Sequence, residues 1–213
     1  MLNGALAWLL QPGPLRVSPH GPGGLATVTP TVLGVTVLLT TWAQDSSQLQ
    51  AGEYAAVEAV ARLLHNHLLE PAMQLSMDAV NQPGVSSALV QATLLSQATA
   101  LGFHSERQGL FADYTTPGLR PDYYRALPEH QTGIILEVER GKTTINNMDL
   151  LDLWKCHICA EAHHLFLLVP QVLQQNADNP RVTRPYDYVR KRLPSFFTAS
   201  TYTNVRSCWL FGY

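Results

Sequence analysis

Two apolar runs separated by one helix-length segment constrain the fold more than any other feature of the chain. Residues 133–139 read Gly-Ile-Ile-Leu-Glu-Val-Glu, and residues 164–170 read His-Leu-Phe-Leu-Leu-Val-Pro. Each run has the length and composition of a buried strand. The segment from 148 to about 162 is predicted to be a helix that crosses from one strand to the next. We therefore expect the two strands to be parallel neighbours in one sheet.

The remaining periodicities add helices and strands on both sides of this crossover unit. In chain order, the central elements are helix, strand, strand, strand, helix and strand, which predicts an α/β fold with a mixed central β-sheet flanked by helices. The predicted elements outside the crossover unit are helices at 53–69, 85–101 and 186–193, strands at 109–114 and 119–127, and a β-rich tail at 196–211.

Length and composition favour one globular domain spanning residues 1–213, with a β-rich N-terminal arm or extension at 1–44. The chain is 46% hydrophobic and 14% charged, against about 25% charged in average chains, which excludes disorder for most of it. Prolines interrupt the uncharged stretch before residue 44, so no membrane span is expected. An odd count of three cysteines fits a reducing compartment, and we expect a cytoplasmic protein.

Three carboxylates are predicted to converge on neighbouring strands. Asp122 follows Pro121, and Glu137 and Glu139 share one face of the next strand because side chains alternate along a strand. Converging carboxylates repel one another unless a cation neutralises them. Mg²⁺ is the expected ion, with Mn²⁺ as the alternative. Otherwise these acids lie at a solvated strand end and pair with nearby arginines, namely Arg120, Arg125 and Arg140.

These residues resemble a known family. Arg120-Pro121-Asp122, followed by a turn and Ile135-Leu136-Glu137-Val138-Glu139, looks like the motif of the PD-(D/E)XK nuclease superfamily, the restriction-endonuclease-like phosphodiesterases. The resemblance covers residues 85–170 as the catalytic core. It implies the core order αβββαβ, hydrolysis of DNA with Mg²⁺, and a homodimer, since enzymes that cut both strands often work as two-fold pairs.

The chain departs from the family pattern at one position. Glu139 stands where the motif has lysine. The chain holds three lysines, and two lie near the motif: Lys142 is the first candidate for the missing lysine, and Lys155 on the following helix is the second. The family often carries an acid in its first core helix, where Gln91 stands here, and Glu58 on the preceding helix is the substitute.

The resemblance implies a role for each residue. Asp122 and Glu137 would hold Mg²⁺, Glu139 would bind the metal or orient the attacking water, and Lys142 would stabilise charge on the phosphate. Net charge is −2, with 14 Lys+Arg against 16 Asp+Glu. This balance excludes a generally basic surface but not a local basic patch.

A local basic patch is present near the C-terminus, with Tyr186 and Tyr188 among its cations. This pattern suits phosphate contacts with stacking, and a solvated helix face is the alternative. The cations proposed to contact DNA are Arg181, Arg184, Arg190, Lys191 and Arg192.

Cys156 and Cys159, followed by His163 and His164, suggest a zinc site. A structural zinc ion usually takes four ligands, so small buried cysteines are the better interpretation. The sequence therefore predicts a Mg²⁺-dependent DNA endonuclease, most simply a type II restriction endonuclease. The alternatives are a non-catalytic DNA-binding or assembly protein on a degenerate nuclease fold, and a structural or metal-sensing domain built on the Cys/His segment.

Overall fold

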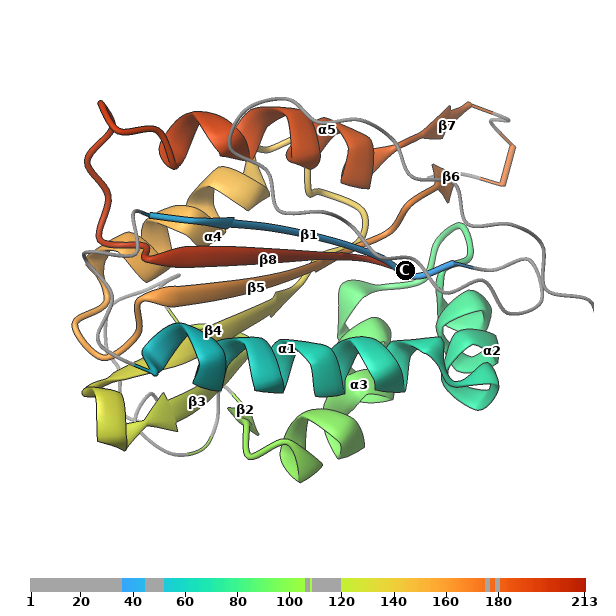
Figure 1. Cartoon of the computed structure of the whole chain (residues 1–213). Helices are drawn as coiled ribbons and strands as arrows, with labels where there is room; N and C mark the ends of the chain where they lie inside the picture. Colours follow the sequence, from blue (N-terminus) through green and yellow to red (C-terminus); the bar gives the residue numbers. More distant parts are fainter. Residues whose placement is uncertain (1–35, 45–51, 106–107, 109–119, 175–176, 179–180) are drawn as a thin grey trace, which may run out of the picture.

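A six-stranded mixed sheet lies between two layers of helices in the computed structural model of the chain (Figure 1). The strand order is β1-β8-β5-β4-β3-β2, and a separate two-stranded ribbon joins β6 and β7. The α/β fold with a mixed sheet is therefore as predicted. The structure describes residues 36–44, 52–105, 108, 120–174, 177–178 and 181–213.

The parallel crossover predicted from the two apolar runs is confirmed. β4 pairs with β5 in parallel, and β5 pairs in parallel with β8, while the other three pairings in the sheet are antiparallel. β4, β5 and β8 thus end at the same edge of the sheet. The sheet strands are β1 Leu38–Ala43, β2 His104–Ser105, β3 Tyr123–Leu127, β4 Thr132–Val138, β5 His164–Val169 and β8 Ser207–Gly212, and the ribbon strands are β6 Leu173–Gln174 and β7 Val182–Thr183.

Alternation along β4 divides the core between the two helical layers. Ile134, Leu136 and Val138 pack with the helices of one layer, whereas Ile135 packs with those of the other. The first layer contains α1 Glu53–Leu69, α2 Pro71–Val80 and α3 Ser87–Ala100; the second contains α4 Met148–Ile158 and α5 Pro185–Arg192 (Figure 1). Glu137 has the parity of Ile135, so it faces α4.

One helix, α2, was not predicted from the sequence. Pro71, two residues beyond the predicted end of α1, occupies the first turn of α2, where proline loses no hydrogen bond. On α3 the buried side chains are Val90, Leu94 and Ala98, whereas Leu89 is 53% exposed. The β-rich tail predicted at 196–211 is confirmed only from residue 207, where β8 begins, and residue 196 ends a 3₁₀ turn instead.

Other predictions fall outside the described residues. The strand at 109–114 and most of the arm at 1–44 lie there, and β1 is the part of that arm that is described. None of the helices in the described ranges has the length and apolarity needed to cross a membrane.

Candidate active site

Asp122 is held beside Glu137 by contacts from two other elements. Gln91 on α3 donates from Nε2 to Oδ1 of Asp122 at 2.7 Å, and the backbone N–H of Val138 donates to Oδ2 at 2.8 Å. The N–H of Asp122 in turn lies 3.4 Å from Oε2 of Glu137. The motif acids on neighbouring strands are therefore brought together, and Gln91 contacts one of them directly.

A buried lysine from α4 completes this cluster. Nζ of Lys155 lies 3.0 Å from Oε1 of Glu137 and 3.1 Å from Oδ1 of Asp152. Glu137 is 2% exposed and the Lys155 side chain is 9% exposed. Lys155, the second of the two lysine candidates, is thus the one in contact with the motif.

Asp152 is a member of the cluster that the sequence analysis did not identify. Its side chain is fully buried, and neither carboxylate oxygen has a hydrogen-bond partner in the described part of the chain. Its contact with Lys155 is an ion pair whose geometry is not that of a hydrogen bond. The available signal was its position three residues before Lys155, which places both on neighbouring turns of one helix.

The cluster carries more negative than positive charge, and the pKa values shift accordingly. Burial, with help from Asp152 and Asp122, raises the pKa of Glu137 well above its usual range, although Lys155 opposes this. Burial also raises the pKa of Asp152 to about 6 against the lowering effect of Lys155. Burial alone would lower the pKa of Lys155, but Glu137 and Asp152 outweigh it and raise that pKa. The ammonium form is therefore stabilised.

Glu139 lies just beyond the end of β4 and extends the same acidic region. Its backbone N–H donates to the carbonyl of Leu168 at 2.8 Å, and its carbonyl accepts from the hydroxyl of Tyr213 at 3.0 Å. Burial, then the charges of Asp152 and Asp122, raise the pKa of the Glu139 carboxyl to about 8. A carboxyl with such a pKa can exchange a proton near neutral pH.

Two other predicted site residues are placed away from these contacts. Lys142 is exposed, in the turn between β4 and α4, and the lysine that contacts Glu137 is Lys155 instead. Glu58 lies on α1, in the other helical layer, and pairs with Arg62 at 2.6 Å.

The alternative of acids paired with arginines at a solvated strand end does not describe Glu137, which is buried. Arg140 instead donates to the carbonyls of Val85 and Gln82, and Arg125 donates to that of Leu101. These guanidinium groups fasten the loops around α3.

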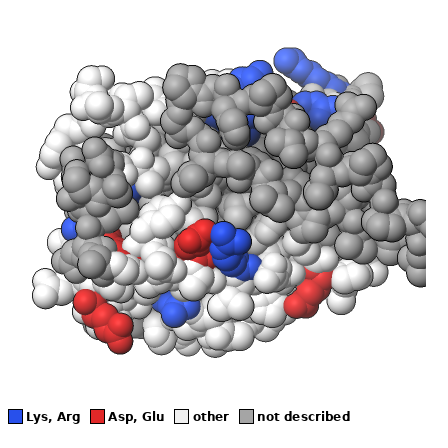
Figure 2. All heavy atoms as spheres, in the orientation of Figure 1, with Lys and Arg blue, Asp and Glu red and all other residues white. Residues whose placement is uncertain are grey.

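The basic cluster predicted from the sequence lies on α5 and β7. Arg181, Arg184, Arg190 and Lys191 are exposed, and Lys and Arg side chains gather at the top of Figure 2, over these elements. Arg192 is partly buried and forms hydrogen bonds to Asp149 and Asn147. Among the tyrosines, Tyr188 is half exposed, while Tyr186 is buried with its hydroxyl 2.6 Å from Thr40.

The Cys/His segment shows no arrangement of metal ligands. The described residues contain no group of three or more His, Cys, Asp or Glu side chains placed to hold a metal ion. Cys156 and Cys159 are free and buried, and burial raises the pKa of Cys159 to about 11. The thiols are therefore protonated core side chains at neutral pH.

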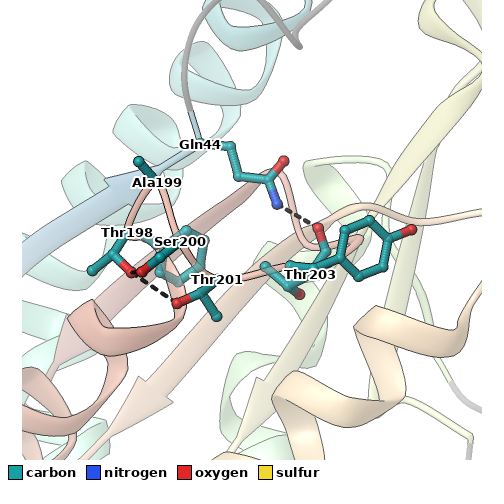
Figure 3. Close-up of a pocket in the computed structure, with 8 residues that line it drawn as sticks. Gln44, Thr198, Ala199, Ser200, Thr201 and Thr203 are labelled. Atoms are coloured by element: carbon teal, nitrogen blue, oxygen red, sulfur yellow. Dashed lines mark hydrogen bonds between the residues drawn. The ribbon is translucent and has the colours of Figure 1, made fainter.

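A pocket of about 420 Å³ lies at the opposite edge of the sheet from the acids. It is lined by Gln44, after β1, and by residues 197–203, before β8. Figure 3 shows the Gln44 amide directed at the carbonyl of Thr203 and a hydroxyl contact of 2.7 Å between Thr198 and Thr201. The pocket contains no charged group, so it offers no chemistry comparable to that of the acid cluster.

Comparison of the chain with protein-family models, curated proteins and solved structures gives no match. The functional argument therefore depends on the geometry of the cluster and on the motif.

Proposed function

We propose that the protein is a Mg²⁺-dependent DNA endonuclease of the PD-(D/E)XK type, most simply a type II restriction endonuclease acting as a homodimer. The observation that carries the proposal is that the Glu137 carboxylate of β4 is in contact both with the backbone N–H of Asp122, just before β3, and with the ammonium of Lys155 on α4. Two acids and a lysine meet at the end of a buried strand. The elements around them follow the order α3, β2, β3, β4, α4, β5, which is the αβββαβ order that the resemblance implies.

Asp122 and Glu137 offer oxygen donors of the type that magnesium takes, while Asp122, Glu137 and Glu139 do not form a three-carboxylate metal group in the described part of the chain. Mg²⁺ prefers oxygen ligands, keeps several waters and commonly takes one or two carboxylates plus substrate phosphate oxygens. Asp122 and Glu137 would supply the two carboxylates, and three converging protein groups are not required. Burial, and then the charges of Asp152 and Asp122, raise the pKa of Glu137, and the carboxylate of Asp152 is buried without a hydrogen bond. A bound cation would relieve the part of this cost that comes from repulsion between the acids. When bound, the ion would polarise the scissile phosphate and lower the pKa of a water.

The side chains around this pair have separate tasks in the proposed reaction. The ammonium of Lys155 stabilises negative charge that develops on the phosphate. Glu137 and Asp152 keep Lys155 protonated. Glu139, whose pKa of about 8 leaves a fraction of it ionised at neutral pH, accepts a proton from the attacking water in its ionised form. The exposed cations of α5 and those that flank β7 hold the DNA backbone.

The proposal is tested with supercoiled plasmid DNA incubated with Mg²⁺ or with EDTA. We expect nicked or linear DNA only with Mg²⁺, and none from Asp122→Ala. Asp78→Ala is the matched control, because Asp78 is an exposed acid on α2. This variant should cleave DNA as the wild type does. Equal cleavage by Asp122→Ala would contradict the site assignment.

One observation favours a second candidate. Glu139 occupies the position of the motif lysine, which is consistent with a fold that binds DNA without cutting it. The same experiment separates the two, because a non-catalytic protein would shift plasmid mobility without cleaving it under any metal condition. The three described cysteines are free and buried, and we place the protein in the cytoplasm as part of the same proposal.

A further inference from the structure

Arg192 forms a two-point side-chain ion pair with Asp149 on the α4–α5 side of the sheet. Its Nε donates to Oδ2 of Asp149 at 2.9 Å, and its Nη2 donates to Oδ1 of the same carboxylate. Its third nitrogen, Nη1, donates to Oδ1 of Asn147 at 2.8 Å. The guanidinium also lies 4.8 Å from the ring centroid of Tyr188. Every nitrogen of this guanidinium therefore has a partner within the protein.

Asp149 depends on this contact because it is completely buried. It lies in the first turn of α4, and its side chain has no exposed surface, whereas that of Arg192 is 20% exposed. A two-point arginine–carboxylate pair fixes orientation as well as distance. Removing one partner of such a buried pair leaves a charge without compensation, at a high cost. The last turn of α5 is thus fastened to the first turn of α4.

The helix that is fastened in this way carries half of the acid–lysine cluster. Asp152 and Lys155 follow Asp149 at intervals of three residues, and all three are buried. The contact between the ammonium of Lys155 and Glu137 on β4 depends on where α4 lies along the sheet. A shift of α4 would move this ammonium relative to Asp122 and Glu137.

We propose that Arg192 is a positioning residue that holds α4, and with it Lys155, in register with the acids on β3 and β4, and does not bind DNA. This inference rests on the proposed nuclease function. It separates Arg192 from Arg190 and Lys191, its exposed neighbours on the same helix. Those two side chains are free to meet phosphate groups, while Arg192 acts on the rate of cleavage through α4.

The test compares single-turnover cleavage and DNA affinity in Arg192→Gln and Arg190→Gln. We expect Arg192→Gln to lower the cleavage rate at saturating DNA by about 10- to 100-fold, the loss typical of a misplaced catalytic group, with DNA affinity changed less than twofold. Arg190→Gln should weaken DNA binding. A weakened affinity in Arg192→Gln with an unchanged saturated rate would overturn the proposal.

Two further variants separate positioning from general loss of folding. Arg192→Lys keeps the charge with one donor group and should recover part of the rate. The double variant Arg192→Gln/Asp149→Asn removes both charges and should cleave faster than Arg192→Gln alone. Arg62→Gln removes an exposed, paired arginine from α1 and serves as the matched control. A double variant no faster than the single one would count against the pair.

Hydrogen exchange keeps the inference testable if the wild type does not cleave DNA, an outcome that would reject only the proposed function. The amides of residues 148–155 should exchange at least tenfold faster in Arg192→Gln than in the wild type or in Arg62→Gln. Exchange should slow again in the double variant. Unchanged exchange in Arg192→Gln would show that Arg192 does not hold α4.

Discussion

The ammonium of Lys155 lies 3.0 Å from Oε1 of Glu137, although the two residues are 18 positions apart in the chain. The crossover from β4 through α4 produces this contact, since α4 packs back on the face of the sheet to which Glu137 points. The two side chains form a buried ion pair, and this ion pair is the centre of the proposed chemistry.

Replacing Lys155 should destabilise the protein in a pH-dependent way. Lys155→Met leaves Glu137 and Asp152 buried without a cation, a loss of about 3–5 kcal/mol, or roughly 6–20 °C in Tm for a chain of this size. The two carboxyls can escape the penalty by protonation, so the loss should be larger at pH 8 than at pH 5. Thermal unfolding at both pH values measures this. Equal losses would mean that neither carboxyl responds to Lys155.

Glu139 should make the protein less stable as pH rises. Its pKa is about 8 in the folded protein against an ordinary value of 4.5, so the folded state holds the proton more tightly than the unfolded state does. Its contribution to stability is complete below pH 4.5 and is lost between pH 4.5 and about 8. Glu139→Gln removes this loss.

Urea unfolding without divalent cations tests this difference. Wild type and Glu139→Gln should be similar near pH 4.5, and the variant should be the more stable at pH 8.5. A constant difference across the range would contradict the raised pKa of Glu139.

The exposed cations of α5 should contribute to DNA binding through phosphates. Arg190→Ala and Lys191→Ala should each weaken binding by a similar factor on any sequence. Each should also reduce the slope of log affinity against log salt concentration by about 1. Fluorescence anisotropy at several salt concentrations measures the slope, with Arg62→Ala as the control. A slope unchanged in both α5 variants would remove this helix from the interface.

Gly133 should tolerate no side chain. An added Cβ would lie 2.5 Å from the Tyr124 ring and 2.8 Å from the carbonyl oxygens of Arg125 and Glu161. Gly133→Ala should therefore cost about 1–3 kcal/mol by overpacking. At Gly141 an added Cβ meets no atom within 4 Å, so Gly141→Ala is the control in the same denaturation series. Equal stabilities of Gly133→Ala and Gly141→Ala would show that β4 shifts to accommodate the added methyl group without cost.

Local patterns predicted the parts of the fold that depend on neighbouring residues. The bounds of α1, at 53–69, agree with the apolar period of that segment, and the apolar runs predicted the parallel pairing of β4 and β5. The proximity of Asp122 and Glu137 followed from strand alternation and one turn. The helix α2 was not predicted, because a proline such as Pro71 is compatible with both the end of one helix and the start of the next.

The parts of the site that the sequence did not predict depend on tertiary packing. Lys142 was the first lysine candidate because it is close to Glu139 in the chain, but α4 returns Lys155 to the acids across the sheet. For Asp152 the spacing of three residues from Lys155 was the available signal, but its burial is decided by how α4 docks on β4. Arg192 was grouped with the exposed cations because its partner, Asp149, is 43 residues away.

The central claim is that this cluster hydrolyses DNA with the lysine of α4, and one measurement addresses it most directly. Single-turnover cleavage of plasmid DNA is measured with saturating Mg²⁺ for the wild type, Lys155→Met, Lys155→Arg and Lys142→Met, each shown to be folded. We predict cleavage by the wild type, a loss of about 100-fold in Lys155→Met, partial recovery in Lys155→Arg and a much smaller effect in Lys142→Met. Absence of cleavage by the wild type, or a wild-type rate in Lys155→Met, would contradict the account.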